Sequence, residues 1–226
     1  MVRAIARRVM QLLAAITVQG VVLFASAGTI WWAAGWLYVA LYAGAIAVSA
    51  ALLIPKHRDL VEERSKGRAG GVSWDRYLTA AQTVPSLGIL AVAGLNERWG
   101  WAPRLPTWLV ALGVALFVLG FAVVVWAMTA NPYFSQVVRI QTERGHTVVS
   151  DGPYRVVRHP GYGGLSVAFL GSALLLGSIW ALLPWAGYVA LTVLRTSLED
   201  TTLATELAGY REYQARTPYR LLPAIW

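Results

Sequence analysis

The sequence predicts an all-α fold, a polytopic bundle of membrane helices that ends in a helical hairpin. Composition is the first reason: 57% of the 226 residues are hydrophobic, only 13% are charged, and 11 are Trp. This profile is unlike that of a soluble globular domain. The second reason is that the apolar residues form runs near the ~20 residues that a helix needs to cross a bilayer. The third is a rigid polar run at 152–162, rich in Pro, Gly, Tyr and Arg, which separates the last apolar block from the others.

Four apolar segments precede the polar run, at residues 10–27, 31–54, 77–95 and 108–129. The uncharged turn Gly28-Thr29 joins the first two and predicts a helical hairpin. The stretch 25–27, Ala-Ser-Ala, also resembles a signal-peptide cleavage site. The apolar run before it is long for a signal, however, and the chain re-enters an apolar segment at once. We therefore interpret both segments as spans, with Trp31, Trp32 and Trp36 in an aromatic belt.

The basic residues indicate how the spans are oriented. Three Arg precede the first span, six Lys or Arg lie in the 55–76 loop, and the 27–30 turn has no charge. By the positive-inside rule, the N-terminus, the 55–76 loop and residues 130–160 are cytoplasmic, with the 27–30 and 96–106 turns outside. The net charge of +8 is thus spread over helix ends and forms no single patch for nucleic acid. The absence of Cys excludes disulfides and thiol catalysis, and the His spacing predicts no metal site.

The apolar block 165–194 is too long for one ordinary span and is interrupted at Gly177-Ser178 and Pro184. Two helical limbs of about 15 residues would reach roughly 22 Å into the membrane and return. Such a hairpin brings Arg195 and Glu199 to the side where the 152–162 run lies. We divide the chain into N-terminal transmembrane helices, 1–130, and a functional region, 131–226, that contains the hairpin and a C-terminal helix.

The motifs of the functional region resemble those of the isoprenylcysteine carboxyl methyltransferase family, whose wider group includes membrane phospholipid N-methyltransferases. The matching residues, in chain order, are Gln141, Glu143, His146 to Val149, Gly152-Pro153-Tyr154, Arg158 to Gly163, Arg195, Glu199, Leu203, Gly209 to Tyr213 and Tyr219 to Pro223. Asp200 stands where many relatives have a second Glu.

The resemblance implies a pocket for S-adenosyl-L-methionine (SAM) on the cytoplasmic side, closed against the membrane. By position, the cofactor-binding residues would be Gln141, His146, Thr147, Val148, Val149, Tyr154, His159, Pro160, Gly161 and Tyr162. The catalytic residues on the acceptor side would be Arg195 and Glu199. The acceptor is expected to be a lipophilic small molecule or a lipidated molecule, with membrane lipids around the protein and no nucleic acid.

The residue types suit methyl transfer. Arg195 can orient a carboxylate through paired hydrogen bonds, whereas an amine acceptor needs a base, for which Glu199 is the candidate. A carboxylate, a phospholipid amine and a small thiol all stay open as acceptors. The alternatives are a sterol-reductase-like, NADPH-dependent membrane reductase and a membrane scaffold or transporter. The alternative role of Arg195 and Glu199, which are four residues apart, is that of an ion pair on a helix surface.

Overall fold

The computed structural model describes residues 2–67 and 70–226, and within them the chain is helical with no strand. Four helices are long and apolar enough to cross a membrane: α1 (Val2–Ala27), α2 (Ala33–Lys56), α4 (Ser73–Trp99) and α5 (Thr107–Ala130). They cover the four predicted spans, except that α2 begins at Ala33 and not at residue 31, and the all-α membrane bundle is confirmed. A short helix, α3 (Arg58–Ser65), lies between α2 and α4.

The predicted hairpin is formed by α6 (Pro160–Leu175) and α7 (Leu182–Glu206), which contact each other along the bundle. Both helices extend beyond 165–194. The polar run was expected to be a turn throughout, but α6 begins inside it at Pro160. The reason is that a proline at the first helical position loses no intrahelical hydrogen bond. Before it lie two short 3₁₀ turns, η1 (Thr142–Arg144) and η2 (Gly152–Arg155), and after α7 comes α8 (Tyr210–Arg216).

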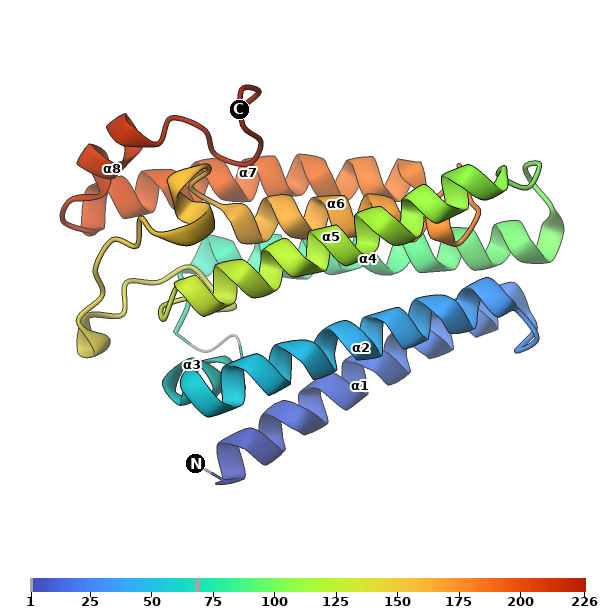
Figure 1. Ribbon diagram of the computed structural model, residues 1–226, viewed down its shortest axis with the longest axis horizontal. Coiled ribbons are helices and arrows are strands. Elements are labelled where there is room, and N and C mark those ends of the chain that lie inside the picture. Colours follow the sequence, from blue (N-terminus) through green and yellow to red (C-terminus); the bar gives the residue numbers. More distant parts are fainter. Residues whose placement is uncertain (1, 68–69) are drawn as a thin grey trace.

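The helices form two groups (Figure 1): α4, α5, α6 and α7 run side by side, and the α1–α2 pair with α3 packs beside them. Helices α5 and α6 approach most closely, because glycines face the partner backbone. A Cβ on Gly120 would lie 2.5 Å from the carbonyl oxygen of Gly164. Small residues permit this contact between membrane helices. It fixes α6, and hence the polar run at its start.

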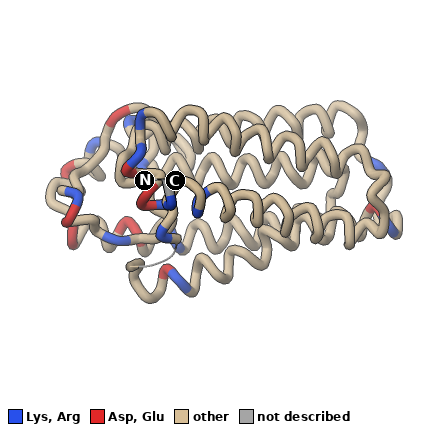
Figure 2. Tube along the Cα trace, turned by 90° about the horizontal axis from the view of Figure 1, so that it is seen from below, with Lys and Arg blue, Asp and Glu red and all other residues tan. Residues whose placement is uncertain are grey.

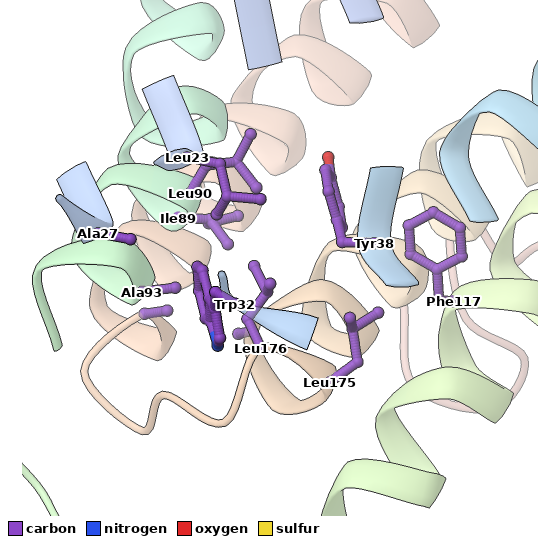
Figure 3. Close-up of a cluster of buried hydrophobic side chains, with 12 residues drawn as sticks. Leu23, Ala27, Trp32, Tyr38, Ile89, Leu90, Ala93, Phe117, Leu175 and Leu176 are labelled. Carbon is purple, nitrogen blue, oxygen red and sulfur yellow. The ribbon is translucent and has the colours of Figure 1, made fainter. Parts of the chain in front are cut away.

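A buried apolar cluster joins the two groups (Figure 3). It includes Leu23 of α1, Tyr38 of α2, Leu90 of α4 and Phe117 of α5. Trp32 also belongs to this cluster and is 6% exposed, so the expectation that it lies in an aromatic belt is wrong. Trp31, 89% exposed, fits that expectation. Burial of Trp32 closes the start of α2 against the bundle.

Charged residues gather at one end of the bundle (Figure 2), where α3, the 131–159 segment, the start of α6, the end of α7 and α8 meet. The opposite end has few charged residues, in agreement with the three in the 96–106 loop. The charged end is where the sequence motifs come together.

Candidate functional site

A cavity of about 340 Å³ lies at the charged end of the bundle. Its walls come from α3, α4, the 131–149 segment, η2, the first half of α6, the second half of α7, and α8. It brings together residues that are far apart in the sequence. Its lining includes Arg64, Tyr133, Phe134, Gln136, Arg139, His146, Thr147, Val148, Val149, Tyr154, Arg158, His159, Gly161, Tyr162, Leu165, Arg195, Glu199, Leu203, Tyr210 and Tyr213.

The 131–149 segment is held in place by its own polar contacts. Asn131 Oδ1 accepts the Tyr133 N–H at 2.8 Å, and the Tyr133 hydroxyl donates to the Gly145 carbonyl at 2.9 Å. Gln141 is fully buried, and its Nε2 donates to the Tyr133 carbonyl at 2.8 Å. The backbone N–H of Gln141 also donates to His146 Nδ1 at 3.3 Å. This contact aims His146 at the cavity, and the His146 ring packs against Tyr133 at 4.4 Å.

Protonation of His146 is disfavoured. Burial, together with the nearby Arg144 and Arg139, lowers the pKa of its imidazole below the ordinary 6.5. The ring is therefore neutral at pH 7, which leaves Nδ1 free to accept the Gln141 N–H. A neutral ring also presents no charge against a cationic ligand.

Asp200 is the buried centre of an ion-pair network on the far side of the cavity wall. The carboxylate, 2% exposed, accepts from Arg158 Nη2 at 2.5 Å, from Arg220 Nε at 2.7 Å and from the Tyr210 hydroxyl at 2.7 Å. His159 Nε2 lies 2.7 Å from the same carboxylate. Because two guanidinium groups share one carboxylate, the network fixes the start of α6 against α7 and α8. Burial and the adjacent Asp200 raise the pKa of the Tyr210 phenol, which stays a donor.

The segment after α8 completes this network. The backbone N–H groups of Arg158 and His159 donate to the carbonyls of Tyr219 and Arg220, both at 2.9 Å. Arg158 Nη1 also donates to the Thr217 carbonyl at 2.7 Å. Arg158 is thus a buried structural residue, in contrast to Arg155, whose side chain is 74% exposed. The contact of Nε2 with Asp200 fixes the orientation of the His159 ring.

Among the described residues that line the cavity, Glu199 is the only acidic one. Its Oε2 accepts the Tyr162 hydroxyl at 2.6 Å, and its Oε1 lies 4.0 Å from His159 Nδ1. The rings of His159 and Tyr162 stack at 5.8 Å. These three groups, from both arms of the hairpin, form a polar corner of the cavity.

Arg195 is held by a residue that the sequence motifs did not point to. Its Nε donates to Asp75 Oδ1 of α4 at 2.7 Å, and Asp75 Oδ2 accepts the Val138 N–H at 2.9 Å. Arg195 Nη2 donates to the Gln136 carbonyl at 3.2 Å, and the guanidinium lies 5.0 Å from the centre of the Tyr162 ring. Asp75 is fully buried. Since a guanidinium has five N–H groups, this arrangement orients Arg195 and leaves further donors for the cavity.

The structure brings most of the predicted site residues to this cavity. Eight of the predicted cofactor residues line it, namely His146, Thr147, Val148, Val149, Tyr154, His159, Gly161 and Tyr162, and so do Arg195 and Glu199. Gln141 and Pro160 are absent from the lining, since Gln141 supports the His146 segment and Pro160 begins α6. Asp75, Arg64 and Arg139 were not among the predicted residues. Among the described residues, no group of His, Asp and Glu is arranged to hold a metal ion.

The chain is similar to a known protein family and to curated proteins. Residues 108–208, from α5 to the end of α7, match the phospholipid methyltransferase family. The chain is also 28% identical over 89 residues to protein-S-isoprenylcysteine O-methyltransferase B of Arabidopsis thaliana, covering 39% of this chain and 41% of that protein. It is 29% identical over 101 residues to a probable protein-S-isoprenylcysteine O-methyltransferase of Oryza sativa subsp. indica, covering 44% of this chain and 53% of that protein.

The chain is thus similar to the phospholipid methyltransferase family and to isoprenylcysteine O-methyltransferases. The family resemblance carried by the motifs is confirmed, for the phospholipid methyltransferase and isoprenylcysteine methyltransferase group. The family match covers residues 108–208, and the chain spans about half the length of the curated relatives it matches.

Proposed function

We propose that this protein is an integral-membrane, SAM-dependent methyltransferase that acts on a lipophilic acceptor from the cytoplasmic side. The observation that carries the proposal is the cavity at the charged end of the bundle. There the predicted cofactor residues of 146–162 face Arg195 and Glu199 of α7.

The residues present fit an adenosyl sulfonium ligand. The cavity of about 340 Å³ lies in the ~300–1,000 Å³ range of small-molecule sites. Aromatic rings of Tyr133, Tyr154 and Tyr162, together with the Glu199 carboxylate, suit a positively charged sulfur. The side chains that would hold the ligand are those of 146–149, Tyr154, His159 and Tyr162. When bound, SAM would supply an electrophilic methyl group, whose carbon would bond to an oxygen, nitrogen or sulfur of the acceptor while its bond to the sulfonium sulfur breaks and S-adenosylhomocysteine (SAH) leaves.

The contribution of the chain is alignment and exclusion of water. Positioning of two reactants contributes several kcal/mol toward such a displacement. Arg195, oriented by Asp75, would hold a carboxylate acceptor in line, and no proton has to move. For an amine acceptor, Glu199 would take the proton, since it is the acidic group of the lining. The Asp200 network would keep His159 and Tyr162 in a single arrangement while ligands exchange.

The relatives suggest the class of acceptor. Two are named isoprenylcysteine O-methyltransferases, which favours a lipidated carboxylate, and the family is named for phospholipids, which favours a phospholipid amine as the second candidate. A small thiol also suits the chemistry. Both relatives and the family are methyltransferases, and this favours methyl transfer over the reductase alternative.

Calorimetric titration of the detergent-solubilised protein tests the proposal. SAM and SAH should bind, and NADPH should neither bind nor compete with them. Absence of binding for both adenosyl ligands, with NADPH binding in their place, would contradict the proposal and favour the reductase.

A further inference from the structure

A second cavity lies beside the candidate site and is mainly apolar. It has a volume of about 230 Å³ and lies among α1, α2, α3, α5 and the start of α6. We call it the tail cavity. Its lining includes Ile5, Leu12, Ala45, Ile46, Leu53, Val61, Val124, Met128, Phe134 and Leu165, together with Arg8 and Arg64.

The tail cavity and the site cavity share a wall. Arg64, Phe134 and Leu165 line both of them. None of the predicted cofactor residues lines the tail cavity. A molecule that extended from the site along this wall would therefore have its polar end at Arg64 and an apolar part between the α1–α2 pair and α5.

Arg64 differs from the other arginines at the site in its partners. Arg158, Arg195 and Arg139 each pair with a carboxylate, those of Asp200, Asp75 and Glu63. In residues 2–67 and 70–226, no carboxylate lies within 4.0 Å of the Arg64 guanidinium. Its Nη1 donates to the Phe134 carbonyl at 3.3 Å, and its guanidinium lies 5.4 Å from the Phe134 ring.

The surroundings of Arg64 are electrostatically unfavourable without an anion. Burial and the nearby Arg8 lower the pKa of the Arg64 guanidinium to about 9, which leaves it charged at neutral pH. The tail-cavity lining contains both of these arginines and no acidic residue. Arg64 is partly buried, and a cation withdrawn from water is costly unless it is paired. An anionic group on the ligand would supply the missing partner.

We propose that Arg64 binds the anionic group of the methyl acceptor, an amphiphile whose apolar chain occupies the tail cavity. This proposal rests on the proposed function and adds a specificity-determining residue to it. In a phospholipid the anionic group is the phosphate. In a lipidated amino acid it is the acceptor carboxylate itself, which Arg64 would bind together with Arg195, since both line the site cavity. Either group suits a guanidinium. A neutral amphiphile of the same length would leave Arg64 unpaired.

Binding measurements test the proposal without need of turnover. The probes are N-acetyl-S-farnesylcysteine, its neutral carboxamide, and vesicles of phosphatidylethanolamine, each titrated in the presence of SAH. Arg64→Gln should weaken binding of the carboxylate probe or of the phospholipid by about 10-fold or more, the loss expected for a hydrogen bond to a charged group. Arg64→Lys should recover part of the loss. The carboxamide should bind wild type and Arg64→Gln equally.

Arg58→Gln is the matched control, because Arg58 is an exposed arginine on the same helix. It should bind every probe as wild type does. Ala45→Phe, which fills the tail cavity, should weaken all lipophilic probes and leave SAH binding unchanged. Carboxylate and phospholipid affinities that are the same in wild type and Arg64→Gln would overturn the proposal. So would a loss of SAH affinity in Arg64→Gln, which would assign Arg64 to the cofactor. A wild-type protein that binds the acid probe but not SAH would instead contradict the proposed function alone.

Discussion

Substitutions in the ion pair between Asp75 and Arg195 distinguish most clearly between a structural and a catalytic role of Arg195. In Asp75→Asn the buried Arg195 guanidinium loses its charged partner. The wild-type carboxylate accepts hydrogen bonds from both Arg195 Nε and the Val138 N–H. The mutant amide has only one acceptor oxygen for these two donors. Removing one partner of a buried pair costs about 3–5 kcal/mol. For a chain of this size this corresponds to a fall in Tm of roughly 6–20 °C, at ~2–4 °C per kcal/mol.

The double variant Asp75→Asn, Arg195→Gln removes both charges. Its Tm should return most of the way to that of wild type, because no unpaired charge stays buried. Methyl transfer should nevertheless stay lost, since Arg195 is assigned to the acceptor, while SAH affinity is retained. The assays are thermal unfolding in detergent, SAH titration and transfer of labelled methyl groups.

Arg76→Gln is the control for this series, because Arg76 is the exposed neighbour of Asp75. It should have the Tm and turnover of wild type. Wild-type Tm in Asp75→Asn would refute the energetic reasoning. Full methyl transfer by the double variant would show that Arg195 only holds α7 to α4.

Three further predictions concern the cofactor side and the topology. His159→Ala should weaken SAH binding about 10-fold or more by titration, whereas Arg211→Ala, on the exposed face of α8, should not. The pKa of His146 lies below its ordinary value, so the stability from the neutral ring is complete above pH 6.5 and lost as pH falls below it. The Tm of wild type should thus fall more than that of His146→Asn from about pH 7.5 to about pH 5.5, and equal slopes would contradict this. A cysteine at Lys66 should resist a membrane-impermeant reagent in intact cells while one at Thr29 reacts, and the reverse pattern would overturn the orientation.

The fold could be predicted because its main determinants are local. Run length and the placement of Lys and Arg define four spans and a hairpin without knowledge of the packing. The errors occurred where packing or end effects decide the structure. Pro160 begins a helix because the first helical position tolerates proline. Trp32 is buried because it belongs to the apolar cluster that joins the two helix groups, which its position after a turn does not reveal.

The site was predictable where its residues are close together in the sequence and not where they are paired across the fold. Residues 146–162 carry their motif on one segment, and eight of the predicted cofactor residues line the cavity. Asp75 lies 120 positions before its partner Arg195. The one signal for it was an acidic residue just before an apolar span. Arg64 was interpreted as a charge that sets topology, because nothing in the sequence shows which cations lack a carboxylate.

SAH titration of two glycine variants tests most directly whether the cavity is the cofactor site. A Cβ on Gly161, which lines the cavity, would lie 2.6 Å from the Phe134 ring, so Gly161→Val crowds the site. A Cβ on Gly187 of α7 would meet Pro85 at 3.8 Å, an ordinary contact, and Gly187→Ala is the control. Wild type and Gly187→Ala should bind SAH with the same affinity, and Gly161→Val should bind about 10-fold or more weakly while staying folded by thermal unfolding. Unchanged SAH affinity in folded Gly161→Val would contradict the placement of the cofactor in this cavity.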